Sequence, residues 1–269
     1  MKKSIVVSTQ QTKFSALAFK EDLGKNIKKV ASLGFDGVEL AVRDPKYLDI
    51  EKIINMVNEA NLEVPAIGTG QAWGEEGLSF SDPDEEVRKK AIDRIIEQIK
   101  FASHFNAKVI IGLIRGVVEE GVSRENAEKW TIASLRECAE FGLKKNVKLT
   151  LEPVNRYESN FINTLQEGVE FIDKIAVSNI GLLADTFHMN IEEVSIYESI
   201  KQSKEYITHI HFADSNRWAP GYGHLDFKKI VETLKEINYQ EYVSAEILPL
   251  PDQNSAAGMT IKTLNKINF

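Results

Sequence analysis

Eight short apolar runs, separated by longer amphipathic segments, constrain the fold of this chain more than any other feature. The runs occupy residues 4–8, 37–42, 64–69, 108–114, 148–153, 181–186, 208–213 and 242–247. Runs of this length are typical of buried strands, and strands that alternate with helices form parallel sheets. Eight such units in 269 residues predict an α/β fold, with one (β/α)8 barrel domain (a TIM barrel) over residues 1–269.

The segments between the runs carry helix signals. Residues 82–105 follow the 3.6-residue period, with Asp82 as candidate N-cap and Pro83 at the first helical position. Residues 123–146 predict a second helix that begins after Ser123. These patterns supply the helices that a parallel barrel needs between its strands.

The longest irregular segment spans residues 68–81 and carries Trp73. Loops that follow barrel strands lie at the catalytic face. Two interpretations stay open: a mobile cover over the site, or a solvated connection whose Trp73 packs on the barrel rim.

Composition narrows the class of protein. The net charge is −7, which argues against binding of nucleic acid phosphates. The single cysteine, Cys138, allows no disulfide framework. No stretch approaches the roughly 18 apolar residues of a membrane span. We therefore expect a cytoplasmic protein that binds neither nucleic acid nor membrane.

Four potential metal ligands lie near the ends of consecutive apolar runs: Glu152, Asp185, His211 and Glu246. They are about 30 residues apart, which is one strand–helix repeat of such a barrel. Ring closure then brings them to one point. Three carboxylates and an imidazole suit a divalent cation, with Mn²⁺ as first choice and Mg²⁺ or Co²⁺ as alternatives.

Each of these residues also has a purely structural interpretation. Glu152 could pair with Arg156, Asp185 could cap the following segment, His211 could be a core histidine, and Glu246 could pair with a loop arginine. The four residues occupy equivalent positions in consecutive strand–helix repeats. This arrangement favours the metal site, because ionisable groups that converge on one place mark functional sites.

Glu152 and Glu246 are also the candidate catalytic residues. They follow the fifth and eighth runs, so they should face each other across the barrel mouth. Two carboxylates beside a metal can remove a carbon-bound proton from one face of a substrate and return one to the other.

Neighbouring polar residues are candidates for substrate binding. We select Glu158, His188 and Arg217, with a rim salt bridge as the alternative for Glu158 and Arg217. His209 points to the same side of its strand as His211, and we interpret it as a lower-layer barrel residue rather than a ligand.

Four motifs carry a family resemblance: LEPVNRYE (151–158), LLADTFHMNIEE (182–193), HIHFADSNRWAPGYGHLDF (209–227) and AEILPLP (245–251). They resemble the D-tagatose 3-epimerase group of the sugar-isomerase barrels, which include xylose isomerase and endonuclease IV. The resemblance implies a xylose isomerase-like TIM barrel and a homo-oligomer, a dimer or tetramer. It implies metal binding and acid/base roles for Glu152 and Glu246, and substrate contacts for the three candidates above. Asp185 and His211 would complete the metal shell.

A closer resemblance, to 5-keto-L-gluconate epimerases, rests on AVRDP (41–45), AIGTGQAW (66–73) and VIIGLIRG (109–116). Arg43 and Arg115 follow the second and fourth runs, and arginine binds carboxylates bidentately. Both are therefore candidate anchors for a sugar acid. Pairing with nearby acids such as Asp44 or Glu119 is the structural alternative.

These observations predict a metal-dependent epimerase that inverts the carbon next to the ketone of a keto-sugar acid, of the 5-keto-L-gluconate to D-tagaturonate type. The alternatives are a D-tagatose or D-psicose type ketose 3-epimerase and a hydroxypyruvate-type aldose–ketose isomerase. A sugar-binding protein without turnover is disfavoured because both glutamates are present. An endonuclease IV-like nuclease is a remote alternative, since the chain has five histidines and a net negative charge.

Overall fold

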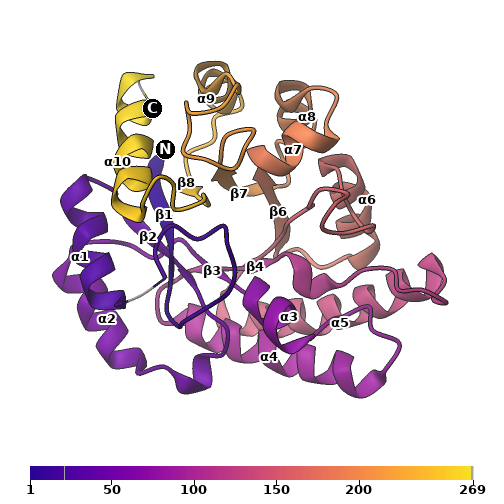
Figure 1. Ribbon diagram of the computed structural model, residues 1–269. Helices are drawn as coiled ribbons and strands as arrows, with labels where there is room; N and C mark the ends of the chain where they lie inside the picture. The colour runs from indigo at the N-terminus through magenta and orange to yellow at the C-terminus, as the bar shows by residue number, and fades with distance from the viewer. Residues whose placement is uncertain (21, 268) are drawn as a thin grey trace.

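Eight parallel strands close into a barrel in sequence order, and the last strand pairs with the first (Figure 1). The structure, a computed structural model, describes residues 1–20, 22–267 and 269. Each apolar run overlaps one strand, so the predicted fold class is confirmed. The strands are β1 (Lys2–Ser8), β2 (Gly37–Ala41), β3 (Ala66–Gly68), β4 (Lys108–Ile111), β5 (Leu149–Leu151), β6 (Ile180–Asp185), β7 (Ile207–Phe212) and β8 (Tyr242–Ala245).

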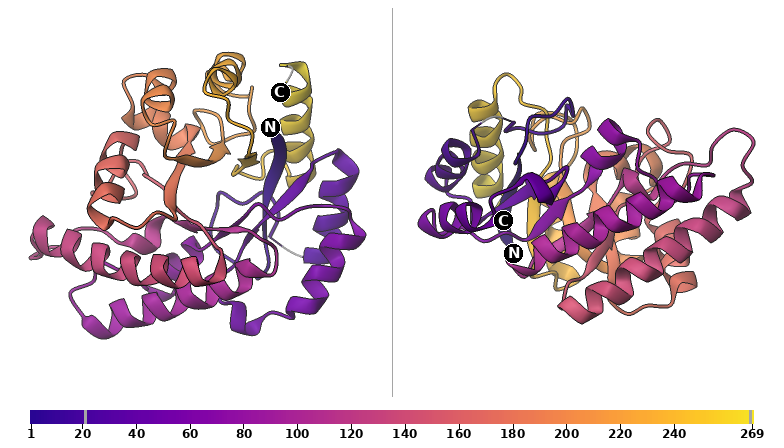
Figure 2. Two further views of the ribbon diagram at one scale, coloured as in Figure 1. Left: turned by 180° about the vertical axis from the view of Figure 1, so that it is seen from behind. Right: turned by 90° about the horizontal axis from the view of Figure 1, so that it is seen from below.

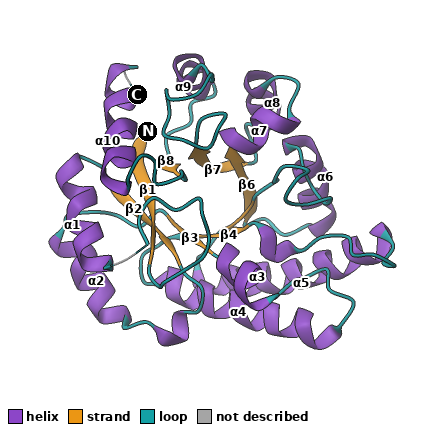
Figure 3. Ribbon diagram, in the orientation of Figure 1, coloured by secondary structure: helices purple, strands orange, loops and turns teal. Residues whose placement is uncertain are grey.

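Helices surround the barrel and cover the outer face of the strands (Figures 1 and 3). Seen from below in Figure 2, α4 and α5 lie side by side, and they pack against each other. None of the described helices is long and apolar enough to cross a membrane. The helices are α1 (Leu23–Leu33), α2 (Ile50–Glu59), α3 (Gly70–Glu76), α4 (Glu85–Ser103), α5 (Arg124–Lys145), α6 (Leu165–Ile175), α7 (Thr186–Glu192), α8 (Ile196–Gln202), α9 (Phe227–Glu236) and α10 (Gln253–Lys266).

The helix starts confirm one expected cap and correct another. Ser123 caps α5 by accepting a hydrogen bond from the backbone N–H of Asn126. Asp84, rather than Asp82, caps α4. The Asp82 carboxylate instead accepts from the backbone N–H of Asp84, so the chain turns once more before the helix begins, and Pro83 lies outside it. Both caps satisfy N–H groups that have no partner within the helix.

Residues 68–81 are more regular than expected, because Gly70–Glu76 form α3. Trp73 is half-buried and packs against the hydrophobic core. This packing agrees with the rim interpretation and gives the segment a fixed place beside the barrel mouth.

Strands β2, β6 and β8 are buried at every residue. A charged side chain in such a strand loses its hydration, which costs several kcal/mol unless a partner or an ion compensates. Glu39 in β2 and Asp185 at the end of β6 are such cases, with exposed fractions of 1% each. These two carboxylates inside the barrel therefore need partners or a bound ion.

Candidate metal centre and active site

The four predicted metal ligands meet at the carboxyl ends of β5 to β8. Glu152 follows β5, Asp185 ends β6, His211 lies one residue before the end of β7, and Glu246 follows β8. One ligand atom from each lies within 4.8 Å of the others. The sequence prediction that ring closure would bring these four together agrees with this geometry.

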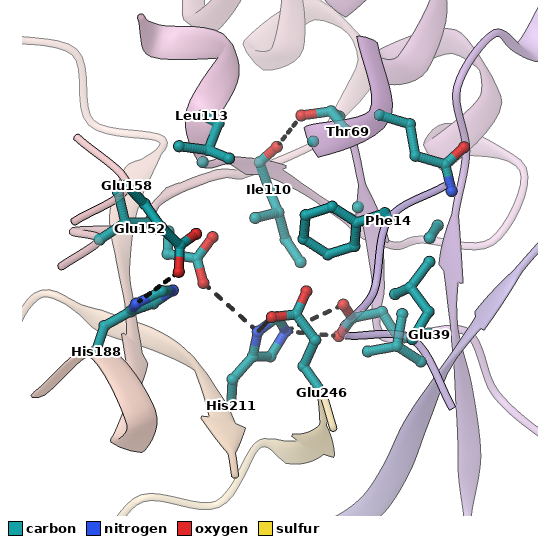
Figure 4. A pocket seen from close by; sticks show the side chains of 18 of the residues that line it. Phe14, Glu39, Thr69, Ile110, Leu113, Glu152, Glu158, His188, His211 and Glu246 are labelled. Carbon is teal, nitrogen blue, oxygen red and sulfur yellow. Dashed lines mark hydrogen bonds and ion pairs between the residues drawn. The ribbon is translucent and has the colours of Figure 1, made fainter. Parts of the chain in front are cut away.

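Three atoms of the cluster have no hydrogen-bond partner within the part of the chain that the structure describes. They are Glu152 Oε1, Asp185 Oδ2 and His211 Nδ1, and all are buried. His211 Nδ1 lies 3.6 Å from Glu152 Oε1 and 3.9 Å from Glu246 Oε2 (Figure 4). It lies 4.0 Å from Asp185 Oδ2. Unpartnered buried acceptors that point at one place fit a cation with a preference for oxygen and imidazole ligands.

The electrostatics of the cluster lead to the same conclusion. Burial raises the pKa of Asp185 to about 8 and also raises the pKa of Glu246. Burial acts the other way on His211, but the negative charge of Glu39 and its hydrogen bonds to the ring, together with the nearby Glu152 and Glu246, outweigh burial and lift the pKa of His211 well above the usual value. A bound divalent cation would favour the ionised carboxylates and the unprotonated ligand nitrogen.

Local backbone structure holds two of the carboxylates. Asp185 Oδ1 accepts from the backbone N–H of Phe187 at 2.7 Å and so caps α7, while Oδ2 faces the cluster. The capping interpretation and the ligand interpretation of Asp185 are therefore compatible. Gly112 leaves room for Glu152, since a Cβ atom on Gly112 would lie 2.6 Å from Glu152 Oε2.

Glu39 is a residue of the site that the sequence prediction missed. Its carboxylate lies 3.0 and 3.2 Å from His211 Nε2 (Figure 4). It also lies 2.8 Å from His209 Nε2. Burial raises its pKa, but the two histidines outweigh burial and lower it, so Glu39 is ionised. A lone acid inside the apolar run GVELA was the available signal, because such a charge requires a partner.

Arg217 and Glu158 form a partly buried ion pair at the edge of the cluster. Arg217 donates to Glu158 Oε1 at 3.0 Å and to Glu246 Oε2 at 2.8 Å. Its guanidinium also lies over the Phe187 ring, 4.8 Å from the centroid. Asn155 donates to the same oxygen of Glu158. The salt bridge considered as an alternative thus exists, but it links the two substrate-binding candidates to Glu246.

His188 presents a hydrogen-bond donor to the site. Its Nδ1 accepts from the backbone N–H of Asn155 at 3.3 Å, and a backbone N–H can only donate. Burial lowers the pKa of His188 well below its usual value, so the ring is neutral and its proton is on Nε2. Nε2 lies 3.7 Å from Asp185 Oδ2, at the margin of the cluster.

A cavity opens beside these groups. Glu152, Glu158, His188, His211 and Glu246 line one side (Figure 4), and Arg217 is also a lining residue. Phe14 and Leu17, from the segment between β1 and α1, and Leu113 and Val154 supply apolar contacts. A cavity with convergent polar groups on one side and apolar walls on the other is typical of small-molecule sites.

Neither Arg43 nor Arg115 is among the residues that line this cavity, so their expected role as carboxylate anchors stays a prediction. Arg43 pairs with Glu75 of α3 at 2.7 Å. Arg115 is fully buried and donates to the backbone carbonyls of Gly112, Phe161 and Ile162. Both guanidinium groups are engaged elsewhere in the fold.

Known proteins share this architecture. The chain is 32% identical over 248 residues to a D-psicose 3-epimerase of Ruminiclostridium cellulolyticum, covering 90% of this chain and 83% of that relative. It is 29% identical over 253 residues to a 3-dehydro-D-guloside 4-epimerase of Escherichia coli, covering 89% and 91%. The structure superimposes on D-psicose 3-epimerase with D-tagatose from Clostridium cellulolyticum H10 with a TM-score of 0.84 at 26% identity, covering 100% and 98% of the two chains.

The xylose isomerase-like TIM barrel family matches residues 27–265. This chain belongs to that family.

Proposed function

We propose that this carbohydrate epimerase inverts carbon 3 of a free ketose, next to the ketone at carbon 2, with Glu152 and Glu246 exchanging the proton. One observation carries the proposal. Three unpartnered buried ligand atoms and Glu246 converge beside a cavity that is also lined by His188 and by the Arg217–Glu158 pair. The sugar epimerases among the relatives support the reaction class.

The donor set fits a divalent cation held by Glu152, Asp185, His211 and Glu246, with Mn²⁺ as first choice. When bound, the cation supplies positive charge that polarises the ketone and stabilises the enediolate form of the substrate. The family resemblance and the carboxylate-rich donor set both favour this group of metals.

The two glutamates suit proton transfer on opposite faces of the sugar carbon. Glu152 and Glu246 come from β5 and β8, so they approach the cavity from different sides of the ring. One removes the proton from carbon 3, and the other returns a proton to the opposite face. Arg217 donates to Glu246 Oε2 and so keeps this carboxylate oriented toward the substrate.

The remaining polar groups would bind the sugar. The neutral His188 donates from Nε2 to a substrate oxygen, and Glu158 accepts from a hydroxyl. Phe14 and Leu17 cover the carbon chain away from the reacting centre. These assignments agree with the roles that the family resemblance implies.

A neutral ketose fits the cavity better than a keto-sugar acid. Arg217 is the only arginine or lysine among the described residues that line the cavity, and two carboxylates already neutralise it. The expected anchors Arg43 and Arg115 lie outside. The preference for a sugar acid expected from the sequence therefore gives way to the ketose 3-epimerase alternative, which the relatives also favour.

We also propose that residues 1–269 act as one domain, because the first and last strands pair within the same barrel.

Deuterium exchange tests the reaction and its substrate together. The Mn²⁺-loaded enzyme is incubated in D₂O with D-psicose, D-tagatose, L-ribulose, 5-keto-L-gluconate or D-tagaturonate, and the metal is removed before proton NMR. We expect deuterium at carbon 3 of one or more neutral ketoses, together with the epimer. Exchange in the keto acids alone would contradict the proposed substrate class, and exchange in none would contradict the reaction.

A further inference from the structure

The carboxylate of Glu39 lies behind the candidate metal ligand His211, on the side away from the cluster. His211 faces the three ligand carboxylates with Nδ1 and faces Glu39 with Nε2. Both rings that touch Glu39, those of His209 and His211, are buried, and so is Glu39 itself. Water therefore does not compete for these hydrogen bonds.

The contact defines which nitrogen of His211 is free to bind a cation. An ionised carboxylate only accepts hydrogen bonds, so a ring nitrogen that faces it must carry the proton. The Nε2 proton of His211 thus points to Glu39, and the Nδ1 lone pair points to the candidate metal position. A carboxylate in this place also makes the imidazole a stronger ligand.

His209 holds Glu39 from a second side. Its Nε2 lies 2.8 Å from Glu39 Oε2, and its ring packs edge-on against that of His211 with centroids 5.3 Å apart. The two histidines are two residues apart on β7, so both side chains reach the same carboxylate across the barrel interior. With two donors on one carboxylate, rotation of Glu39 would break two buried hydrogen bonds.

We propose that Glu39 is a positioning residue that fixes the tautomer and orientation of His211 for metal binding, with His209 holding Glu39 in place. The inference rests on the proposed metal centre and deepens it. Glu39 touches neither the reacting carbon nor the metal in this role; it acts through His211.

Metal affinity measured without sugar tests this role. Glu39→Gln keeps the shape of the side chain and removes its charge. We expect the Kd for Co²⁺, followed by its visible absorption, to rise about 10–100-fold, the usual cost of losing such a partner. The matched control Glu63→Gln, at the opposite end of the barrel beside Lys2, should keep the Kd of the wild type.

Turnover then separates positioning from catalysis. At saturating metal, Glu39→Gln should recover a kcat within about threefold of the wild type, because its defect lies in metal binding. Unchanged metal affinity would overturn the proposal. So would a large loss of kcat at saturating metal with normal affinity. Two metal ions per wild-type chain and one in the variant would make Glu39 a ligand of a second site, which also contradicts it.

The wild-type protein offers a test that does not depend on the variant folding. Two-bond proton–nitrogen NMR of the Mg²⁺-loaded, ¹⁵N-histidine-labelled protein reports which ring nitrogen carries each proton. We expect His211 and His209 protonated at Nε2. A proton on Nδ1 of His211 would overturn the proposal. Because the Kd measurement and the NMR experiment use no sugar, their outcomes are independent of whether the proposed ketose activity is found.

Discussion

The two halves of the barrel contribute to the active site in different ways. The ends of β5 to β8 supply the four candidate metal ligands. The other half supplies groups that hold them: Glu39 in β2 contacts His211, and Gly112 after β4 leaves room for Glu152. Substitutions at the ends of β5 to β8 should therefore affect the chemical step. Substitutions in the half that contains β1 to β4 should affect how the site is assembled.

Two arginines, the fully buried Arg115 and the partly buried Arg217, show the same contrast. Arg115 follows β4 and donates to neutral backbone carbonyls, and burial lowers its pKa to about 10. Arg217 follows β7; burial acts to lower its pKa too, but Glu246, Asp185 and Glu158 outweigh it and raise the pKa. The partners, rather than the position after a strand, decide whether an arginine stabilises the fold or serves the site.

Glu246→Gln should give the largest loss of activity. Glutamine can still accept the hydrogen bond from Arg217, but it cannot take a proton from carbon. We expect deuterium exchange at carbon 3 to fall about 10²–10⁴-fold at saturating metal, the usual contribution of an acid or base. Glu63→Gln is the matched control, and circular dichroism checks the fold. Near-normal exchange in Glu246→Gln would exclude it from proton transfer.

Arg115→Met should act on stability rather than on turnover. Methionine fills much of the volume but leaves carbonyls of Phe161 and Ile162 without their donors. We expect the free energy of unfolding to fall by about 2–5 kcal/mol, because unsatisfied buried carbonyls are costly. Denaturant titration measures this free energy of unfolding. The kcat of the folded variant should stay within about threefold of the wild type. A selective loss of keto-acid turnover would restore Arg115 as an anchor.

Stability of the metal-free protein should fall as pH rises. The native pKa of Asp185 is about 8, and that of Glu246 is also raised, so the native state keeps protons that the unfolded chain has lost above about pH 4. Fewer protons in the unfolded state mean that stability decreases from about pH 5 to 8. The raised pKa of His211 acts in the same direction, because the proton that stabilises the native state is lost as the pH rises.

Bound metal replaces these protons, so the melting temperature of the Mn²⁺-loaded protein should depend less on pH over this range. The difference in melting temperature between the Mn²⁺-loaded and the chelator-treated protein should widen from pH 5.5 to 8. If the melting temperatures of the two proteins changed with pH in parallel, these groups would not interact with the metal.

Arg43→Ala should have the smallest effect. Arg43 is partly exposed and pairs with Glu75 outside the cavity. Exposed ion pairs contribute about 0–1 kcal/mol, so turnover of neutral ketoses should change less than about twofold. The same small change is expected for any keto acid that the enzyme accepts. A loss confined to keto acids would show that Arg43 binds their carboxylate.

The strands and the four-ligand cluster could be predicted from the sequence because each depends on local pattern. Glu152, Asp185, His211 and Glu246 each lie near the end of an apolar run, and the regular repeat of the barrel converts sequence spacing into spatial proximity. The caps depended on finer detail. Asp82 and Asp84 both precede an acidic first turn, and only the backbone path selects Asp84.

Contacts between distant strands could not be predicted in the same way. Glu39 finds its partners His209 and His211 across the barrel, and no local pattern links them. Phe14 lies in an irregular segment whose path over the cavity depends on tertiary packing. Arg115 occupies the expected place after its strand, but its orientation is set by carbonyls of residues 161 and 162, in the segment after β5.

Metal removal and restoration tests the central claim most directly. Carbon-3 exchange of the best ketose is measured with the chelator-treated protein, verified free of metal, and again after Mn²⁺ is added back. We predict that exchange is lost on removal, returns on addition, and does not return in Asp185→Asn at the Mn²⁺ concentration that restores the wild type. Exchange that persists at the full rate in the verified metal-free protein would contradict the account.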